Sequence, residues 1–318
     1  METILITVAV VIFEELFKQG IILMKDMIRL IVNLLYLSSR KYQENFIKRH
    51  CCLVMLEEND HLRTSLNMEQ LFIETRFLVN NAHQSGIEVA NETQYLIVHG
   101  QPGSGKSVFL KWLAMEALKR EERIYNHQLI PVFIDAERLN SPDINLLSLI
   151  KDEFLLADLP YVDKFTKEAL KMGRLLILID EIDRIPEENH NRSRAITHIQ
   201  DFIHLYDKNR FVVSCRTQNR YIYRGKLGYP QRELATWNDD QMQSYIQKYS
   251  HTHKWPDSTD KNLWRFLQET TNSQVQDLVR IPVYLTYLCI YYQQQSFPRD
   301  GSFLEGLDLK SAIEYRNT

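Results

Sequence analysis

A glycine-rich run at residues 100–107 constrains the fold of this chain more than any other feature. It reads Gly-Gln-Pro-Gly-Ser-Gly-Lys-Ser and fits the pattern G-x-x-x-x-G-K-[ST]. An apolar, strand-like run (95–98) precedes it, and a helix-like run (108–119) follows it. A strand, a glycine-rich loop and a helix in this order predict a phosphate-binding loop, in which backbone N–H groups and the helix dipole face phosphate oxygens.

The residue types in this loop indicate a nucleotide and a metal ion. Lys106 is expected to reach the β- and γ-phosphates, and the Ser107 hydroxyl is expected to ligate Mg²⁺. The sequence therefore predicts ATP or ADP with Mg²⁺ as the bound species. The nucleotide-binding residues predicted in the loop are Gly100, Gln101, Pro102, Gly103, Ser104, Gly105, Lys106 and Ser107.

A second apolar run (175–179) is followed by acidic residues that would complete the site. A carboxylate directly after a buried strand lies at the carboxyl edge of a parallel sheet, where such a loop also lies. Asp180 is predicted to hold Mg²⁺, directly or through water. Glu181 and Asp183 are candidate catalytic residues that would orient or deprotonate the attacking water.

Short apolar runs alternate with helix-like runs through the middle of the chain. This alternation predicts an α/β fold, a P-loop NTPase parallel sheet sandwiched by helices. Arg216 follows the last of these runs, and we expect it to sense the γ-phosphate and to stabilise charge in the transition state. The strand-like runs are 95–98, 129–134, 175–179 and 210–214.

The pattern divides the chain into five predicted segments. The strand pattern fades after about residue 220, and helix-like runs separated by polar breaks take its place. The segments are an N-terminal apolar helical segment (1–60), a connector (61–94), the nucleotide-binding domain (95–220), a small C-terminal helical domain (221–295) and a truncated or irregular tail (296–318).

Composition limits the partners and the compartment. The chain has 318 residues and a formal net charge of −3, which gives no strong signal for binding nucleic acid. Its four cysteines form no C-x-x-C pair, so we expect a reduced, cytoplasmic compartment. The apolar run at 3–13 is shorter than the about 20 residues that span a bilayer. We interpret the N-terminal segment as helices of a small domain; a helix that binds a membrane surface or a protein partner, and a transmembrane span, are the alternatives.

Taken together, the motifs resemble the NACHT-type members of the signal-transduction ATPases with numerous domains, which include animal inflammasome receptors and bacterial defence proteins. The resemblance rests on the loop and on residues 130–139, 173–183, Arg216 and 280–285. It implies an ATP-dependent oligomerisation switch in defence or stress signalling, such as innate immunity. It further implies that Arg216 is a sensor arginine, that Pro282 lies near the nucleotide base, and that the N-terminal helices contact an effector or adaptor protein.

Two departures from the family pattern bear on hydrolysis. Glu181 stands where a small residue is usual, and Arg184 stands where the family often has glutamate. We therefore expect firm nucleotide binding and slow ATPase turnover. Two other functions are considered as alternatives: a conventional P-loop ATPase acting on nucleic acid, and a non-hydrolysing scaffold associated with a membrane.

Overall fold

The computed structural model describes most of the chain from residue 40 to residue 294. The predicted helical run before residue 40 and the predicted tail (296–318) fall outside the described residues. The described ranges are 40–56, 63–80, 82–119, 122–140, 145–157, 159, 162–186, 190–219, 228–271 and 273–294.

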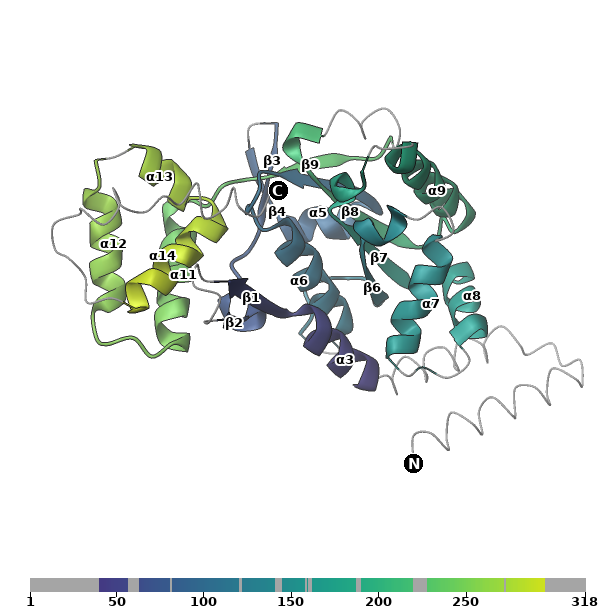
Figure 1. Ribbon diagram of the computed structural model, residues 1–318, viewed down its shortest axis with the longest axis horizontal. Coiled ribbons are helices and arrows are strands. Elements are labelled where there is room, and N and C mark those ends of the chain that lie inside the picture. The colour runs from purple at the N-terminus through teal and green to yellow at the C-terminus, as the bar shows by residue number, and fades with distance from the viewer. Residues whose placement is uncertain are drawn as a thin grey trace, which may run out of the picture.

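A seven-stranded sheet forms the centre of the molecule (Figure 1). Its strand order is β4-β3-β9-β5-β8-β7-β6, and the five strands from β9 to β6 run parallel. At the other end, β3 pairs antiparallel with both β9 and β4. The strands are β3 Arg76–Val79, β4 Ala82–Ser85, β5 Tyr95–Gly100, β6 Ile130–Asp135, β7 Leu175–Asp180, β8 Arg210–Arg216 and β9 Gln231–Leu234.

Helices cover the sheet, which confirms the predicted α/β class. All six residues of β7 are buried, so both faces of the sheet are covered at this strand. Helix α6 packs across β5, β8, β7 and β6, and α7 packs on β6 and against α8 and α9. These elements are α5 Gly86–Glu92, α6 Lys106–Leu118, α7 Leu146–Leu156, α8 Val162–Lys171, α9 Asn191–Leu205 and the 3-10 helices η1 Ala136–Asn140, η2 Ile182–Arg184 and η4 Thr217–Asn219.

Two stretches predicted to lie outside the sheet contribute strands to it. The predicted connector supplies β3 and β4, and it also contains the short helix α4 (Met68–Leu71) and α5. Residues 231–234, inside the predicted helical domain, form β9 between β3 and β5. Both predictions are wrong at these residues, because each strand has only four residues of mixed polarity. So short a run carries little periodicity, and pairing with the neighbouring strand decides its structure.

The predicted helical segment 1–60 is also wrong at its end. Residues Cys52–Leu56 form β1, which pairs antiparallel with β2 (Arg63–Asn67) in a separate two-stranded sheet. A run of five apolar residues is compatible with a helix or with a strand, and here the partner strand decides. Helix α3 (Arg40–His50) precedes this pair.

Helix α3 packs on β6, the edge strand of the large sheet. The Tyr42 hydroxyl donates a hydrogen bond to the Pro131 carbonyl, and the His50 ring lies 5.0 Å from the Phe133 ring, centroid to centroid. Proline is accepted in an edge strand, because no neighbouring strand needs its missing N–H. The contact covers an edge that would otherwise present unpaired backbone groups.

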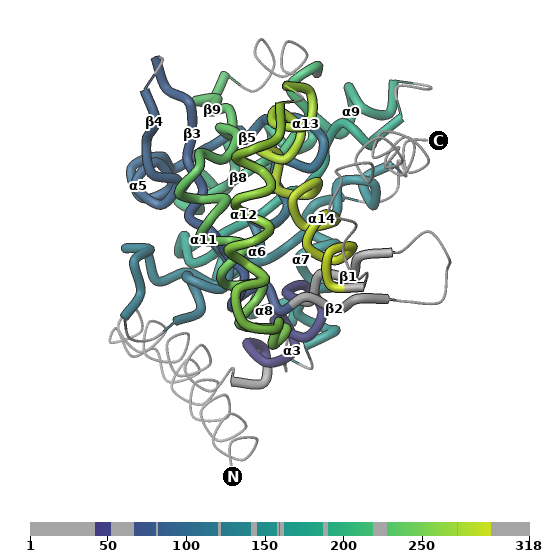
Figure 2. Tube along the Cα trace, turned by 90° about the vertical axis from the view of Figure 1, so that its left-hand side faces the viewer, coloured from purple at the N-terminus to yellow at the C-terminus, as the bar shows by residue number. Residues whose placement is uncertain are grey.

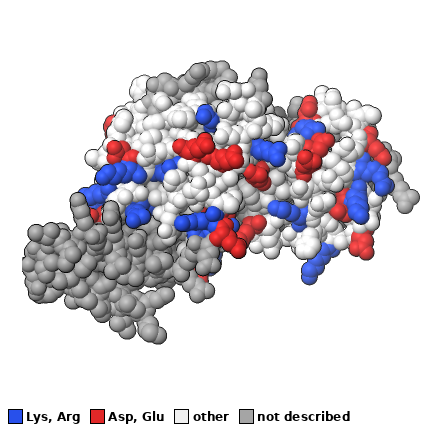
Figure 3. All heavy atoms as spheres, turned by 180° about the vertical axis from the view of Figure 1, so that it is seen from behind, with Lys and Arg blue, Asp and Glu red and all other residues white. Residues whose placement is uncertain are grey.

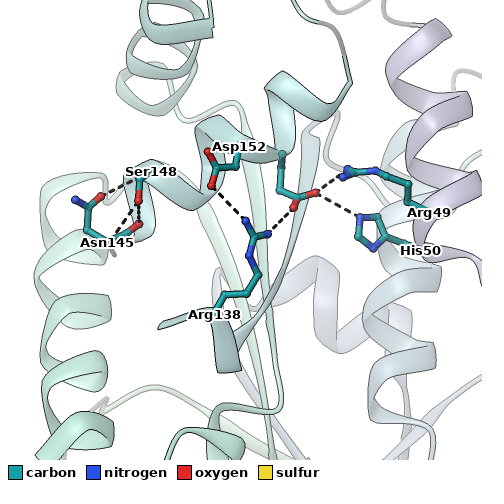
Figure 4. Close-up of polar contacts among 7 residues, drawn as sticks. Arg49, His50, Arg138, Asn145, Ser148 and Asp152 are labelled. Atoms are coloured by element: carbon teal, nitrogen blue, oxygen red, sulfur yellow. Dashed lines mark hydrogen bonds and ion pairs between the residues drawn. The ribbon is translucent and has the colours of Figure 1, made fainter. Parts of the chain in front are cut away.

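A buried carboxylate fixes the end of α3 to the rest of the domain (Figure 4). Glu153 of α7, whose side chain is 4% exposed, binds Arg49 at 2.6 Å and Arg138 of η1 at 2.8 Å. His50 lies 3.5 Å from the same carboxylate. Burial favours the neutral acid, but His50 and Arg49 outweigh it and hold the pKa of Glu153 below its ordinary value.

The C-terminal helices form a bundle with its own core, beside the sheet in Figure 1 and in front of it in Figure 2. Leu71 of α4 and Ile73, which come after the β1–β2 pair in the chain, are part of this core. Asn238 caps the first helix in a capping box with Gln241. None of the described helices is long and apolar enough to cross a membrane. The bundle helices are α11 Asp239–Thr252, α12 Thr259–Glu269, α13 Ser273–Val279 and α14 Pro282–Gln294.

Candidate nucleotide-binding site

The glycine-rich run forms a tight loop between β5 and α6. Gly103 and Gly105 have φ angles of +77° and +94°, a left-handed region that favours glycine. Gly100 is packed so closely that a Cβ there would lie 2.5 Å from Ser104 Oγ. The glycines thus allow a backbone path that brings N–H groups to the N-terminus of α6, as a phosphate loop requires.

The ammonium group of Lys106 lies inside this loop. Lys106 is 6% exposed, and its Nζ donates to the carbonyl oxygens of Gly100 and Gln101, each at 3.0 Å. Burial lowers the pKa of Lys106, and the nearby carboxylates of Asp183 and Glu181 offset only part of that decrease. The loop therefore presents a fixed cation at the place predicted for the phosphates.

Asp180 ends β7 as predicted, and a serine of the next strand orients it. Ser214 of β8 donates from its Oγ to Asp180 Oδ1 at 2.5 Å, and the Glu181 N–H donates to the same Oγ at 2.8 Å. Ser214 is fully buried. Ser214 is not among the site residues predicted from the sequence, although a hydroxyl inside an apolar strand two residues before Arg216 is a recognisable signal.

Glu181 has an unusual backbone conformation. Its φ is +54° and its ψ is +52°, a left-handed conformation that is costly for a residue with a branched or long side chain. Its carboxylate binds Arg184 Nε at 2.7 Å. Burial and the Asp180 carboxylate raise the pKa of Glu181, while Arg184 lowers it. The acid therefore stands beside Asp180 but is paired with an arginine.

Arg216 and Asp183 hold each other at the same sheet edge. The Arg216 N–H donates to Asp183 Oδ1 at 3.0 Å, and Arg216 Nε lies 3.3 Å from Oδ2. Strand pairing sets Arg216 opposite Gly100, at the start of the loop. The fold thus brings together the loop, the acids after β7 and Arg216, of which the loop and Arg216 are more than 100 positions apart in sequence.

The first turn of α14 lies directly on the loop. The Val283 N–H donates to the Gly103 carbonyl at 3.3 Å, and a Cβ on Gly103 would lie 2.2 Å from Val283 Cγ1. Pro282 Cγ would lie 3.9 Å from a Cβ on Gly105. Pro282 is therefore placed against the phosphate loop, and Val283, which the sequence analysis does not single out, makes the closer contact.

The residues present fit a nucleotide with its metal ion. The Ser104 Oγ is buried and has no hydrogen-bond partner among the described residues, so a ligand oxygen could satisfy it. Within the described ranges, no three acidic, histidine or cysteine side chains gather closely enough to hold a metal by themselves. Mg²⁺ needs only one or two protein ligands when phosphates supply the others, and Asp180 and Ser107 are of the right kind.

Charges of both signs are interspersed on the face seen in Figure 3. The Lys and Arg side chains there alternate with Asp and Glu, and the described part of this face carries no continuous basic stripe. A nucleic-acid backbone is recognised mainly by such a stripe.

Comparison with known proteins gives one family and several similar structures. The NACHT domain model matches residues 94–253, half of the 318-residue chain. The match includes the loop, the acids after β7 and Arg216. No curated protein matches the chain.

Three of the similar solved structures have low sequence identity to this chain. Domain III of the Thermotoga maritima replication initiation protein DnaA is 16% identical, with a TM-score of 0.37, over 71% of this chain and 86% of that one. The initiator DnaA bound to AMPPCP and single-stranded DNA is 13% identical, with a TM-score of 0.39, over 72% and 62%. The Walker-type ATPase of Pyrococcus abyssi is 11% identical, with a TM-score of 0.44, over 73% of each chain.

Proposed function

The chain belongs to the NACHT-domain family, a family of nucleotide-binding P-loop NTPases, and from this premise we propose that it is an ATP-dependent oligomerisation switch. In this proposal ADP holds a closed monomer, and its exchange for ATP moves the helical bundle and permits self-association. The switch would act in defence or stress signalling in the cytoplasm. The segment before residue 40 would contact the protein partner or the membrane surface.

The contact between α14 and the phosphate loop carries the proposal. Val283 donates to the carbonyl of Gly103, so the bundle touches the backbone that would surround the phosphates. A ligand shifts a conformational equilibrium only through contacts that differ between the two states. A γ-phosphate that changes the loop at Gly103 would change this contact, and the bundle would respond.

The remaining residues have distinct roles in the proposal. Lys106 binds the β- and γ-phosphates, and Asp180 and Ser107 hold Mg²⁺, which would neutralise phosphate charge when bound. Arg216 is positioned by Asp183 at the edge of the loop and would detect the γ-phosphate. Hydrolysis returns the switch to its ADP form, and slow turnover gives the ATP form time to assemble.

The test compares molecular mass in two nucleotide states. Size-exclusion chromatography with light scattering is run in ADP and in a non-hydrolysable ATP analogue. The proteins are the unaltered chain, Lys106→Ala, and the control Lys167→Ala, which removes an exposed lysine of α8 outside the site. We expect a larger mass only with the ATP analogue, and only in the unaltered chain and the control.

Two results would contradict the switch. The same mass with ADP and with the ATP analogue would contradict the oligomerisation step. Unchanged nucleotide affinity in Lys106→Ala would contradict the proposed nucleotide-binding site. ATPase activity that rises strongly with added DNA or RNA would favour the conventional ATPase instead.

A further inference from the structure

We propose that Arg184 is a positioning residue that holds the Glu181 carboxylate away from the attacking water and thereby keeps hydrolysis slow. This inference rests on the proposed function, because it concerns hydrolysis at the same site. It adds a specific brake, made of two residues three positions apart, that the proposed switch does not itself require.

The geometry places both residues at the catalytic edge of the sheet. Glu181 follows Asp180 at the end of β7, and its N–H is fixed by Ser214 of the neighbouring strand. Its carboxylate does not stay unpaired beside the loop, because Oε2 binds Arg184 Nε at 2.7 Å. Arg184 is the last residue of η2 and Glu181 is its N-cap, so the pair spans one turn of the chain.

The backbone conformation of Glu181 also supports a role for this residue in the reaction. A residue with a side chain in the left-handed region is strained, and such strain gathers at functional sites, where the surroundings hold it in place. Glycine would occupy this conformation at lower cost. A glutamate in this conformation, beside the Mg²⁺ ligand proposed for the site, is explained if its carboxylate acts in the reaction.

The ion pair is weak enough to open during turnover. The side chains of Arg184 and Glu181 are 46% and 26% exposed, so water competes with their attraction. The pair therefore acts as a brake that slows the reaction without abolishing it. An exposed pair of this kind corresponds to a rate factor of about 2- to 5-fold.

The chemical step to which the brake applies is the hydrolysis of ATP to ADP and phosphate. The water oxygen bonds to the γ-phosphorus as the bond from the γ-phosphorus to the bridging oxygen breaks. The electron pair of that bond stays on the terminal oxygen of ADP, and the proton lost by water ends on phosphate or solvent. A released Glu181 carboxylate would orient this water by accepting its hydrogen bond.

The experiment is a set of variants measured in three ways. Arg184→Gln removes the charge, Arg184→Lys keeps it, and Glu181→Gln removes the acid, alone and combined with Arg184→Gln. The control is Lys171→Gln, which breaks a similar i,i+3 pair with Glu168 on α8. Each is measured for steady-state kcat and KM, for ATP-analogue affinity, and for melting temperature without nucleotide.

We expect Arg184→Gln to raise kcat by about 2- to 5-fold with KM and analogue affinity unchanged, whereas Arg184→Lys and the control keep the original kcat. The gain should vanish in the Glu181→Gln background. Without nucleotide, the two single Gln variants and the double variant should show similar small decreases in melting temperature, about 1–2 °C, because the same pair is lost in each.

Three outcomes would overturn the brake: an Arg184→Gln kcat equal to or below that of the unaltered chain, an equal gain in the Glu181→Gln background, or no hydrolysis in either protein. None of these alters the mass shift with the ATP analogue, which tests the switch separately. Conversely, a faster Arg184→Gln with no mass shift would support the brake and contradict the switch.

Discussion

Replacing Gly103 with alanine is expected to separate α14 from the phosphate loop. A Cβ at this position would lie 2.2 Å from Val283 Cγ1, closer than real carbon atoms approach, and 3.0 Å from Val283 Cβ, a tight contact. Val283 is β-branched and stiff at χ1, so its side chain cannot simply turn away. The helix that carries it must shift, and the hydrogen bond from the Val283 N–H to the Gly103 carbonyl would be lost with that shift.

The expected loss in the free energy of unfolding has two parts, one from the backbone and one from packing. Alanine at a φ of +77° costs about 1–2 kcal/mol, of which the stiffer unfolded chain returns about 0.4–1 kcal/mol, leaving about 1 kcal/mol. Forcing a methyl group into the packed contact adds about 1–3 kcal/mol. As long as α14 stays in contact with the loop, Gly103→Ala should therefore lower the free energy of unfolding by about 2–4 kcal/mol.

Gly228 supplies a matched control for the first part. Its φ is +65°, and a Cβ there would meet nothing within 4 Å, so Gly228→Ala should cost only the backbone part of about 1 kcal/mol. The double variant Gly103→Ala/Val283→Ala removes the clashing Cγ1 atom and should approach the Gly228→Ala value. Urea denaturation followed by circular dichroism gives the free energies, and light scattering in ADP gives the mass.

Gly103→Ala should lose more stability than Gly228→Ala, and the double variant should lie close to Gly228→Ala. Equal losses for Gly103→Ala and Gly228→Ala would refute the contact between α14 and the loop, as would a double variant no more stable than Gly103→Ala. For the proposed switch, Gly103→Ala in ADP should also associate more than the control. An unchanged monomer would show that this contact does not hold the closed state.

Glu153→Gln should destabilise the chain by about 1–3 kcal/mol, less than a fully buried pair, because the Arg49 side chain is 26% exposed and can be rehydrated. Since the pKa of Glu153 is lowered by folding, its contribution is present above its ordinary value of about 4.5 and is lost as the pH falls through the lower folded value. Denaturation at several pH values should therefore show a weaker acid dependence in Glu153→Gln than in the unaltered chain. Glu181→Gly should keep the free energy of unfolding within about 1 kcal/mol of the unaltered chain, because about 1–2 kcal/mol of left-handed strain is relieved, about 0.5–1 kcal/mol is lost to glycine flexibility, and about 0.2–1 kcal/mol is lost with the Arg184 ion pair. Ser214→Ala leaves Asp180 and the Glu181 N–H without their buried partner, which should cost about 1–3 kcal/mol by the same measurement.

Each of these has an outcome that contradicts it. An unchanged acid dependence in Glu153→Gln would mean that the carboxylate is not held in its charged form by folding. A loss of more than about 1 kcal/mol in Glu181→Gly would show that the glutamate side chain contributes more than its backbone strain costs. A Ser214→Ala variant as stable as the unaltered chain would mean that water replaces the hydroxyl.

Local sequence patterns determined the nucleotide loop and the strands around it. The runs at 95–98, 129–134, 175–179 and 210–214 correspond to β5, β6, β7 and β8, and the α/β class followed from their alternation with helices. A continuous apolar run is typical of a strand buried on both faces, so the sequence alone indicates these strands. The spacing of the loop and the left-handed glycines within it are likewise local properties.

Tertiary structure decided which strands pair and which distant residues lie side by side. The strand order places β8 between β5 and β7, and only this order sets Ser214 beside Asp180 and Arg216 beside Asp183. Strands β3, β4 and β9 have four residues each and mix polar with apolar side chains, so they give no continuous apolar run, and they exist because the sheet supplies their partners. The contact of Val283 with Gly103 joins residues 180 positions apart. A sequence specifies residue types and local spacing, whereas register and packing are set by free energies summed over many distant contacts, and those became visible only in the folded chain.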